Sequence, residues 1–390
     1  MIQPLNSKDK QTFLNFIKYC NNEHYLSTVA KKDIAFEFHF GSLIKNPFCP
    51  NYCKFCIVDG VTQYTYPYIS RQDFKEGWEL YKKLGDYKPS KQLSFIHGDY
   101  LAHPYIYDFL EQIRNDGYSI QCCNNMLLLK EDKIDFMKSI DLHIIFTTHT
   151  YNKAKREILY RNSDYTWDKV NLITKELNKN IMGVSVLYLG DDDETFKDIE
   201  YIHKTYHHMN PDWPGIFLGP LEHSIYSRPE IKEMSLYAYS KYQNFVDKLK
   251  KFSTDIKVHY TPIRFDTEED LKEGEASFCE GIFPNEYVDV ENILSGLRGK
   301  VLFCSSERAY KYWKQRLKKY KNIEIINIIN YSCGGSFGAA AFLHISDINI
   351  AINNKTADHL LLPRAMFSWE VIKETKPIKD INFIGEIHIV

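Results

Sequence analysis

The sequence predicts an α/β protein with a parallel sheet, because short apolar runs alternate with longer stretches of helical spacing about six times. Polar residues follow several of the apolar runs, where parallel strands place their ligand-binding ends. A loop with three cysteines follows the first apolar run. This alternation fits either an open doubly wound sheet or a full or partial TIM-like (βα) barrel. We predict the barrel, with a small C-terminal α/β domain.

The elements can be placed from their periodicity. A helix is expected over residues 8–20, with Ser7 as its cap. Residues 33–40 form the first strand, because Ile34, Phe36, Phe38 and Phe40 alternate with other residues. Further strands are expected at residues 93–97, 119–124, 143–148, 182–189, 215–219 and 256–260. Helices are expected at residues 70–84, 104–115, 165–177, 194–207 and 229–252.

The pattern changes near residue 265, where charged and glycine-containing segments replace the alternation. We predict an N-terminal helical extension at 1–32, a barrel at 33–264, a linker or cover segment at 265–299 and an α/β domain at 300–390. Within the last domain we expect strands at 300–304, 323–330 and 359–362, and a helix at 309–320. A glycine-rich turn at 333–338 either cradles an anion on its N–H groups or packs against the barrel.

Composition limits the possible partners. The chain has 49 lysines and arginines against 51 aspartates and glutamates, so no strong positive field attracts a nucleic acid. It has no run of about 18 uncharged apolar residues and no secretory signal at its N-terminus. We therefore expect a soluble, cytoplasmic protein that has neither a membrane nor a nucleic acid as its partner.

The strongest chemical signal is the C-x3-C-x2-C loop formed by Cys49, Cys53 and Cys56. Three thiolates on a short loop hold three irons of a [4Fe–4S] cluster and leave the fourth iron open to another ligand. A zinc site is the alternative, although it usually has a fourth protein ligand and paired C-x2-C spacings. Cys279, Cys304 and Cys333 are far apart in sequence, so we expect no second cluster.

This loop and the strand–helix alternation resemble the radical S-adenosylmethionine (SAM) superfamily. The resemblance implies that the three cysteines hold the cluster and that SAM binds its fourth iron. Phe55 then lies beside the adenine. It also implies an external low-potential electron donor, such as flavodoxin or ferredoxin, and reductive cleavage of SAM to a 5′-deoxyadenosyl radical.

A closer resemblance covers most of the chain. It lies in the segments CPNYCKFCIVDG, LSFIHGDY, FTTHTYNKAKREILYRN, VLYLGDDDETF, IINIINYSCGGSFGAAAFLHISDI and HLLLPRAMF. They resemble a radical SAM subfamily that has a C-terminal domain of unknown function and whose longer members carry an N-terminal PDZ-like domain. This resemblance implies the fold and the cofactor but no substrate.

Four candidate residues follow the second and third strands. The superfamily commonly has a Gly-Gly-Glu stretch that contacts the SAM amino group, and the resemblance assigns this role to Gly98 and Asp99. His97 replaces the first glycine and puts the contact in doubt. Tyr100 is a candidate catalytic residue beside them. Asn124 is either a ligand of the SAM ribose or carboxylate or part of a simple turn.

The next strand ends supply further candidates. Cys123 is either a hydrogen-atom donor to a product radical or a small apolar filler. His149 is either a site residue or a structural histidine. Of Arg156 and Arg161, we select Arg161 as the ligand of the SAM carboxylate. Leu187 borders the adenine if the resemblance holds.

Asp193 precedes a helical stretch and is expected to be its N-cap. The expected function is a biosynthetic radical SAM enzyme that abstracts hydrogen from a small-molecule substrate. The alternatives are a peptide-modifying radical SAM enzyme and a non-catalytic zinc or iron–sulfur binding protein.

Overall fold

The computed structural model describes residues 53–56, 70–83, 92–95, 99–140, 142–160, 167–209, 215–223, 227–252, 256–261, 263, 287–331, 343, 345–363 and 380–390. The predicted helix at 8–20, the strand at 33–40 and the turn at 333–338 lie outside these residues, as do Cys49, Gly98, Arg161, Cys279 and Cys333. The chain divides into two compact units. The first consists of Met1–Leu221 and Tyr226–His259, and the second of Glu222–Ile225 and Tyr260–Val390.

The first unit contains a six-stranded sheet in the order β1-β2-β3-β4-β5-β6, in which β1 to β5 pair in parallel. The strands are β1 Gln92–Phe95, β2 Ser119–Asn124, β3 Leu142–His149, β4 Ile181–Tyr188, β5 Gly215–Pro220 and β6 Val258–Tyr260. The helices are α5 Arg71–Lys83, α6 Ile106–Asn115, α7 Ile134–Ser139, α8 Lys153–Leu159, α9 Trp167–Glu176, α10 Asp192–Met209 and α11 Pro229–Lys251.

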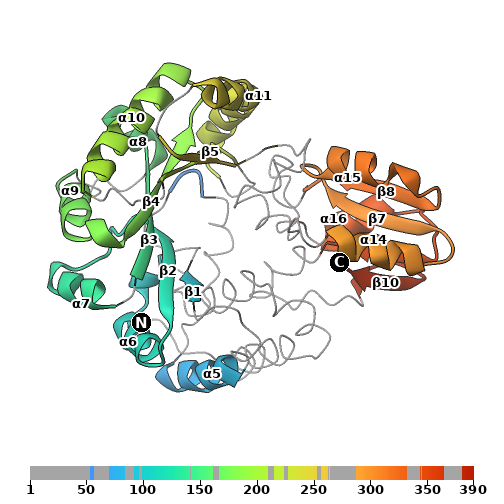
Figure 1. The fold of residues 1–390 in the computed structure, drawn as a ribbon, viewed down its shortest axis with the longest axis horizontal. Helices are drawn as coiled ribbons and strands as arrows, with labels where there is room; N and C mark the ends of the chain where they lie inside the picture. Colours follow the sequence, from blue (N-terminus) through green and yellow to red (C-terminus); the bar gives the residue numbers. More distant parts are fainter. Residues whose placement is uncertain are drawn as a thin grey trace. The chain divides into compact units, whose positions relative to one another are not determined.

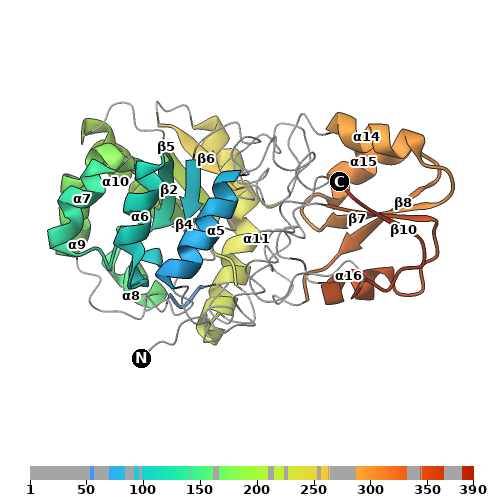
Figure 2. The ribbon, with the colours of Figure 1, turned by 90° about the horizontal axis from the view of Figure 1, so that it is seen from below.

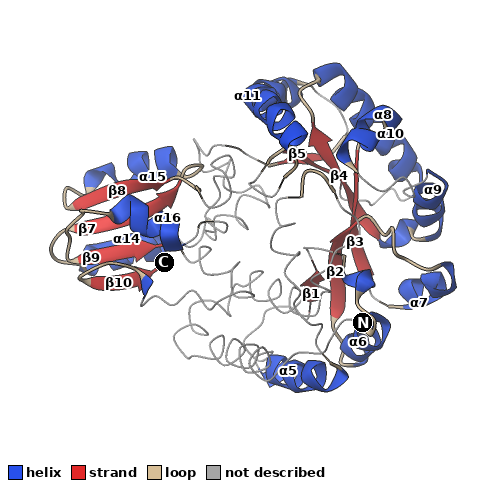
Figure 3. Cartoon of the chain, turned by 180° about the vertical axis from the view of Figure 1, so that it is seen from behind, coloured by secondary structure: helices blue, strands red, loops and turns tan. Residues whose placement is uncertain are grey.

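The sequential strand order explains why the helices cover one side of this sheet. Parallel crossovers are right-handed, so a chain that always adds its next strand on the same edge places every helix on the same face. Figures 1 and 3 show α6, α7, α9, α10 and α11 on the convex side of the curved sheet. This is the arrangement of a partial (βα) barrel rather than of an open doubly wound sheet, which confirms the predicted fold class.

The burial of alternate strand residues follows from the same arrangement. Cys122, Phe146 and Val186 point to the helix-covered face and are fully buried. On this face the ring of Tyr188 stacks on Phe245 of α11, with 4.7 Å between the ring centroids. The opposite, concave face carries the half-buried positions of the strands.

The second unit has a four-stranded parallel sheet in the order β10-β9-β7-β8. Its strands are β7 Val301–Ser306, β8 Ile323–Ile328, β9 His359–Leu362 and β10 Glu386–Ile389. Its helices are α14 Tyr287–Gly296, α15 Tyr310–Arg316 and α16 Ile345–Ile352. Because β8 and β9 lie on opposite sides of β7, the helices occupy both faces, and Figure 2 shows α14 and α15 opposite α16.

Several details differ from the sequence-based expectations. Residues 287–296, placed in the cover segment, form α14, whose Val290 and Leu294 pack in the hydrophobic core of the second unit. The edge strand β10 was not expected at all. The prediction that Asp193 caps α10 is wrong, because the helix begins at Asp192 and the carboxylate of Asp191 accepts the N–H of Glu194 at 3.0 Å. In the part of the chain that the structure describes, no helix has the length and apolar character of a membrane span.

Candidate active site

The described part of the cysteine loop is a tight turn. The N–H of Cys56 donates to the carbonyl oxygen of Cys53 at 3.1 Å. Such a bond closes a four-residue turn and brings its ends within about 7 Å. Both thiols are half-buried and neither is in a disulfide. The turn therefore brings the backbone of the two cysteines close together.

Two segments far apart in sequence hold this turn. Cys53 forms an antiparallel bridge with Tyr160, and the N–H of Lys54 donates to the carbonyl of Leu159 at 2.8 Å. On the other side, the N–H of Arg228 donates to the carbonyl of Lys54 at 3.0 Å. Leu159 ends α8, which follows β3, and Arg228 precedes α11, which follows β5. The thiols are thus fixed between segments that follow two strands of the sheet.

Aromatic side chains connect the turn to the end of β3. The ring of Phe55 contacts His149 edge-on, with 4.9 Å between centroids, and also meets Tyr160 edge-on at 5.9 Å. The rings of His149 and Tyr160 are nearly parallel, with centroids 6.0 Å apart. We call Phe55, His149 and Tyr160 the aromatic wall. It supplies flat apolar surface directly beside the two thiols.

His149, in this aromatic wall, has an unusual backbone conformation and a lowered side-chain pKa. Its backbone has φ of 62°, in the left-handed region, where histidine is tolerated better than most side chains. Burial, and then the positive charge of Arg156, lower its pKa from 6.5 to about 3. Among the described residues, none forms a hydrogen bond with its Nδ1 atom. His149 is therefore a neutral imidazole at neutral pH.

Asp99 and Asn124 lie together although they are 25 residues apart. The side-chain amide of Asn124 donates to Oδ1 of Asp99 at 3.2 Å, and the same oxygen accepts the N–H of Leu101 at 3.0 Å. Oδ1 of Asn124 accepts the N–H of Met126 at 2.5 Å. Both side chains are buried. The pair ties the segment that follows β1 to the last residue of β2.

Tyr100 faces the hydrophobic core. Its side chain is fully buried, and its hydroxyl donates to Sγ of Cys122 at 3.3 Å. Burial raises the pKa of the Tyr100 hydroxyl and that of the Cys122 thiol. This placement gives Tyr100 a packing contact, and we do not include it in the proposed mechanism.

Cys123 and Leu187 lie on the concave face of the sheet. Cys123 pairs in register with Ile145, and Thr147 pairs with Ser185, two residues before Leu187. These side chains are all half-buried, whereas their strand neighbours on the helix-covered face are buried. The concave face thus combines a thiol, two hydroxyls and apolar carbon, which suits an amphipathic ligand.

Two residues of this site were not selected from the sequence. Tyr160 pairs with Cys53, and Arg156 lies buried with its guanidinium 5.6 Å from the centre of the Tyr160 ring. Arg156 was weighed against Arg161 for the SAM carboxylate, and no sequence signal favoured it. Its helical spacing of four from Tyr160 is the only hint that the two side chains meet.

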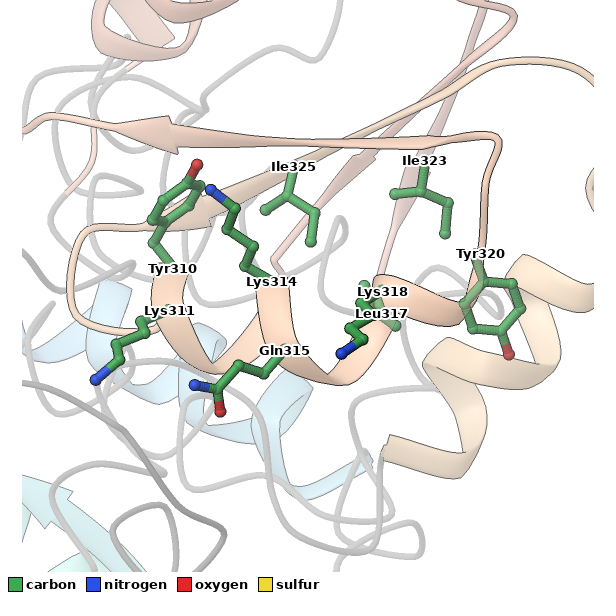
Figure 4. Close-up of a pocket in the computed structure, with 9 residues that line it drawn as sticks. All are labelled: Tyr310, Lys311, Lys314, Gln315, Leu317, Lys318, Tyr320, Ile323 and Ile325. Atoms are coloured by element: carbon green, nitrogen blue, oxygen red, sulfur yellow. The ribbon is translucent and has the colours of Figure 1, made fainter.

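One surface depression lies on the second unit, over α15 and β8. Figure 4 shows its lining residues, which are Tyr310, Lys311, Lys314, Gln315, Leu317, Lys318, Tyr320, Ile323 and Ile325. This set contains no thiol, imidazole or carboxylate. It therefore does not compete with the cysteine turn as a redox or metal centre.

The turn fits a cubane cluster. Cys53 and Cys56 have the C-x2-C spacing of cluster ligands and lie in one turn. Cys49, four positions before Cys53, completes the three-cysteine motif. Thiols in this arrangement at the edge of a parallel α/β sheet are suited to holding an iron–sulfur cluster.

The sequence profile of the radical SAM superfamily matches residues 43–205, which include all three cysteines and extend into α10. These residues are a radical SAM domain. The chain thus carries a radical SAM domain, the kind of domain whose cofactors are a [4Fe–4S] cluster and SAM.

Several solved structures are similar to this chain at low identity. SuiB of Streptococcus suis bound to S-adenosylmethionine is 11% identical with a TM-score of 0.43, and the similarity covers 55% of this chain and 48% of SuiB. For anSMEcpe with bound AdoMet the identity is 12%, the TM-score 0.42 and the coverage 55% and 61%. For TYW1 with a lysine-pyruvate adduct these values are 16%, 0.36, 53% and 70%.

The chain spans about half of the length of the SuiB chains it matches. No curated protein matches the sequence.

Proposed function

We propose that the enzyme cleaves SAM reductively and uses the resulting radical to abstract hydrogen from a small-molecule substrate. The cluster supplies one chemical step when bound, the transfer of an electron that breaks the C5′–S bond of SAM to give methionine and a 5′-deoxyadenosyl radical. An external low-potential donor such as flavodoxin or ferredoxin provides that electron. The observation that carries the proposal is the anchored turn of Cys53 and Cys56 beside the aromatic wall.

The chain's own residues bind and position the reactants. Cys53 and Cys56, together with Cys49, hold the cluster. Phe55 and Tyr160 offer ring faces and edges to the adenine, and His149 presents a neutral nitrogen to a polar group of SAM. Arg156 is buried, and its guanidinium carbon lies 5.6 Å from the centre of the Tyr160 ring. We assign Arg156 to the SAM carboxylate, and Arg161 remains a candidate for the same role.

The concave face receives the substrate. Leu187 borders the adenosyl group, and Cys123 is the hydrogen-atom donor candidate because its thiol lies on this face rather than in the helix-covered core. Gly98 and Asp99 are proposed near the SAM amino group, and Asn124 near the SAM ribose or carboxylate. Asp99 and Asn124 would make these contacts in addition to the hydrogen bond between them. A radical site must hold one substrate carbon beside C5′ and exclude water, which is a positioning task.

A small molecule is proposed because the chain has nearly balanced charge and therefore no field that selects a polyanion. The subfamily with a C-terminal domain of unknown function remains the proposed closer relationship. Peptide modification is the competing outcome, and the experiment below separates it.

The test is anaerobic reconstitution with iron and sulfide, followed by incubation with SAM and dithionite and chromatography for 5′-deoxyadenosine. We expect about four irons per chain and formation of 5′-deoxyadenosine. Cys53→Ala and Cys56→Ala should lose both. Cys304→Ala, which removes a buried thiol in the second unit, should retain both. A fully loaded cluster that never cleaves SAM would refute the proposal.

Substrate class is tested by adding cell extract separated by dialysis. The proposal expects the dialysable fraction to increase 5′-deoxyadenosine formation. Deuterium from a labelled extract should then appear in the 5′-deoxyadenosine. Stimulation by the retained, protease-sensitive fraction alone would instead identify a peptide substrate.

A further inference from the structure

Three metal-ligating side chains converge on the second unit, away from the cysteine turn in sequence. His359 begins β9, and Glu386 and His388 lie on the neighbouring edge strand β10. Glu386 pairs in register with His359, and Glu386 and His388 share one face because they are two residues apart. The ligand atoms of all three side chains lie within 4.8 Å of one another.

The distances among these atoms are nearly equal. Nδ1 of His359 lies 3.2 Å from Nε2 of His388, and Oε2 of Glu386 lies 3.4 Å from the first nitrogen and 3.6 Å from the second. Three ligands of a tetrahedral zinc ion with bonds of about 2.0–2.1 Å are separated by about 3.4 Å. Adjacent ligands of an octahedral ion with similar bonds are separated by about 3.0 Å. The triangle therefore has the size of a tetrahedral zinc face.

The ring of His359 is already oriented for binding. Its Nε2 atom lies 2.9 Å from the backbone carbonyl of Arg298, which accepts a hydrogen bond. An N–H at this position leaves Nδ1 as the nitrogen with a lone pair. Metal-binding histidines generally donate their second nitrogen to a carbonyl or carboxylate in this way.

The carbonyl that orients His359 is itself fixed by the fold. Gly299 has φ of 97°, which a side chain rarely adopts, and turns the chain after Arg298. The N–H of Lys300 then donates to the carboxylate of Asp358 at 2.7 Å, and the N–H of His359 donates to the carbonyl of Lys300 at 3.1 Å. The hydrogen bond between His359 and the carbonyl of Arg298 is thus fixed by the backbone contacts that pair β7 with β9.

The two imidazoles are mostly shielded from solvent, whereas the carboxylate is exposed. The side chains of His359 and His388 are 14% and 20% exposed, whereas that of Glu386 is 66% exposed. Water can therefore reach the fourth position of a tetrahedral ion.

We propose that His359, Glu386 and His388 form a mononuclear zinc site, separate from the cluster, with water as the fourth ligand. His359 and Glu386 are the first residues of their parallel strands, so the site lies at the amino ends, opposite the edge where α/β sheets usually bind ligands. Its role is structural: zinc ties the four-residue edge strand β10 to β9 and stabilises the C-terminal segment. Binding to the folded chain raises stability by mass action.

The competing explanation is a metal-free hydrogen bond in which Nε2–H of His388 donates to Nδ1 of His359. That arrangement also explains a separation of 3.2 Å. It does not require the carboxylate of Glu386, and it predicts no bound zinc. The two explanations therefore differ in metal content and in the effect of a change at Glu386.

The experiment uses the full chain with its cluster reconstituted anaerobically, so that iron occupies the cysteines. The protein is treated with a mild chelator, equilibrated with Zn²⁺, desalted and analysed for zinc and iron. We expect one zinc per chain in the wild type in addition to the cluster iron. His359→Ala and His388→Ala should lose the zinc and retain the iron, and Glu386→Gln should weaken zinc binding by roughly 10-fold or more.

His207→Ala is the matched control, because it removes an exposed histidine of α10 that stacks on His203 at the surface. This variant should bind zinc like the wild type. Thermal unfolding in chelator verifies that each variant folds, and Zn²⁺ should raise the Tm of the wild type and of His207→Ala but not of His388→Ala. Absence of zinc from the wild type, or equal zinc in wild type and Glu386→Gln, would overturn the proposal in favour of the hydrogen-bonded pair.

Discussion

The ring of Phe55 meets the imidazole of His149 edge-on, with 4.9 Å between the two ring centroids. This contact joins the cysteine turn to the carboxyl end of β3. Since Phe55 immediately precedes Cys56, one of the proposed cluster ligands, a molecule bound at the cluster would be close to the aromatic wall. The contact therefore links cofactor binding to the position of the third strand.

Phe55→Ala should weaken SAM binding while leaving the cluster intact. Loss of an aromatic contact costs about 1–2 kcal/mol, which corresponds to roughly a 10-fold increase in Kd. Equilibrium dialysis of the reconstituted protein with labelled SAM measures the change, and Phe55→Tyr, which keeps the ring, serves as its control. Unchanged SAM affinity at full iron loading would remove Phe55 from the SAM site.

The lowered pKa of His149 predicts that the stability of the folded chain depends on pH. Its pKa of about 3 in the folded chain lies below the ordinary value of 6.5, so the unfolded chain binds the proton more tightly. The stabilisation is complete above about pH 6.5 and is lost as the pH falls toward 3. It amounts to a few kcal/mol at most, at about 1.4 kcal/mol per unit.

Urea unfolding of the cluster-free chain at pH 7.5 and pH 5 measures this loss. His149→Asn removes the titrating group and suits a residue with φ of 62°, because asparagine tolerates that backbone. We expect the variant to lose less stability than the wild type between the two pH values. Equal losses would show that His149 does not titrate as its burial and the charge of Arg156 require.

The hydrogen bond between Asp99 and Asn124 should couple the effects of their substitutions on the free energy of unfolding. Asp99→Ala leaves two buried donors without their shared acceptor, the amide of Asn124 and the N–H of Leu101, and should cost about 1–3 kcal/mol of unfolding free energy. A double-mutant cycle with Asn124→Ala measures the coupling, for which we expect about 0.5–1.5 kcal/mol. Strict additivity of the two changes would contradict a direct bond between them.

The described strands of the barrel could be predicted because they are short segments rich in apolar residues between helical stretches. The expected strand at 119–124 and the observed β2 coincide, and β4 differs by one residue at each end. The edge strand β10 escaped prediction because it has four residues, half of them charged or polar, and lacks the length over which a period of two can be recognised. The helix α7 has only six residues and escaped for a similar reason.

The cysteines could be selected from the sequence because their spacing is local. The contacts around them could not, because Tyr160 reaches Cys53 only through folding of the β3–α8 segment. The convergence of His359 with His388 depends on the register of β9 and β10, which no local pattern specifies. Local spacing thus predicts the ligands of the cluster, whereas tertiary pairing is needed to find the residues that surround it.

Substitution by alanine should have opposite effects on the unfolding free energy at Gly183 and at Gly296. A Cβ at Gly183 would contact the Phe217 ring and lie 2.9 Å from the carbonyl oxygen of Gly215, so the concave face between β4 and β5 has no room for a methyl group. Gly183→Ala should therefore cost about 1–3 kcal/mol of unfolding free energy. At Gly296, in α14, a Cβ meets nothing within 4 Å, so Gly296→Ala should stabilise by about 0.5–1 kcal/mol. Urea midpoints of the two variants measure both effects, and a neutral Gly183→Ala would mean that Phe217 moves freely and does not fix the spacing of β4 and β5.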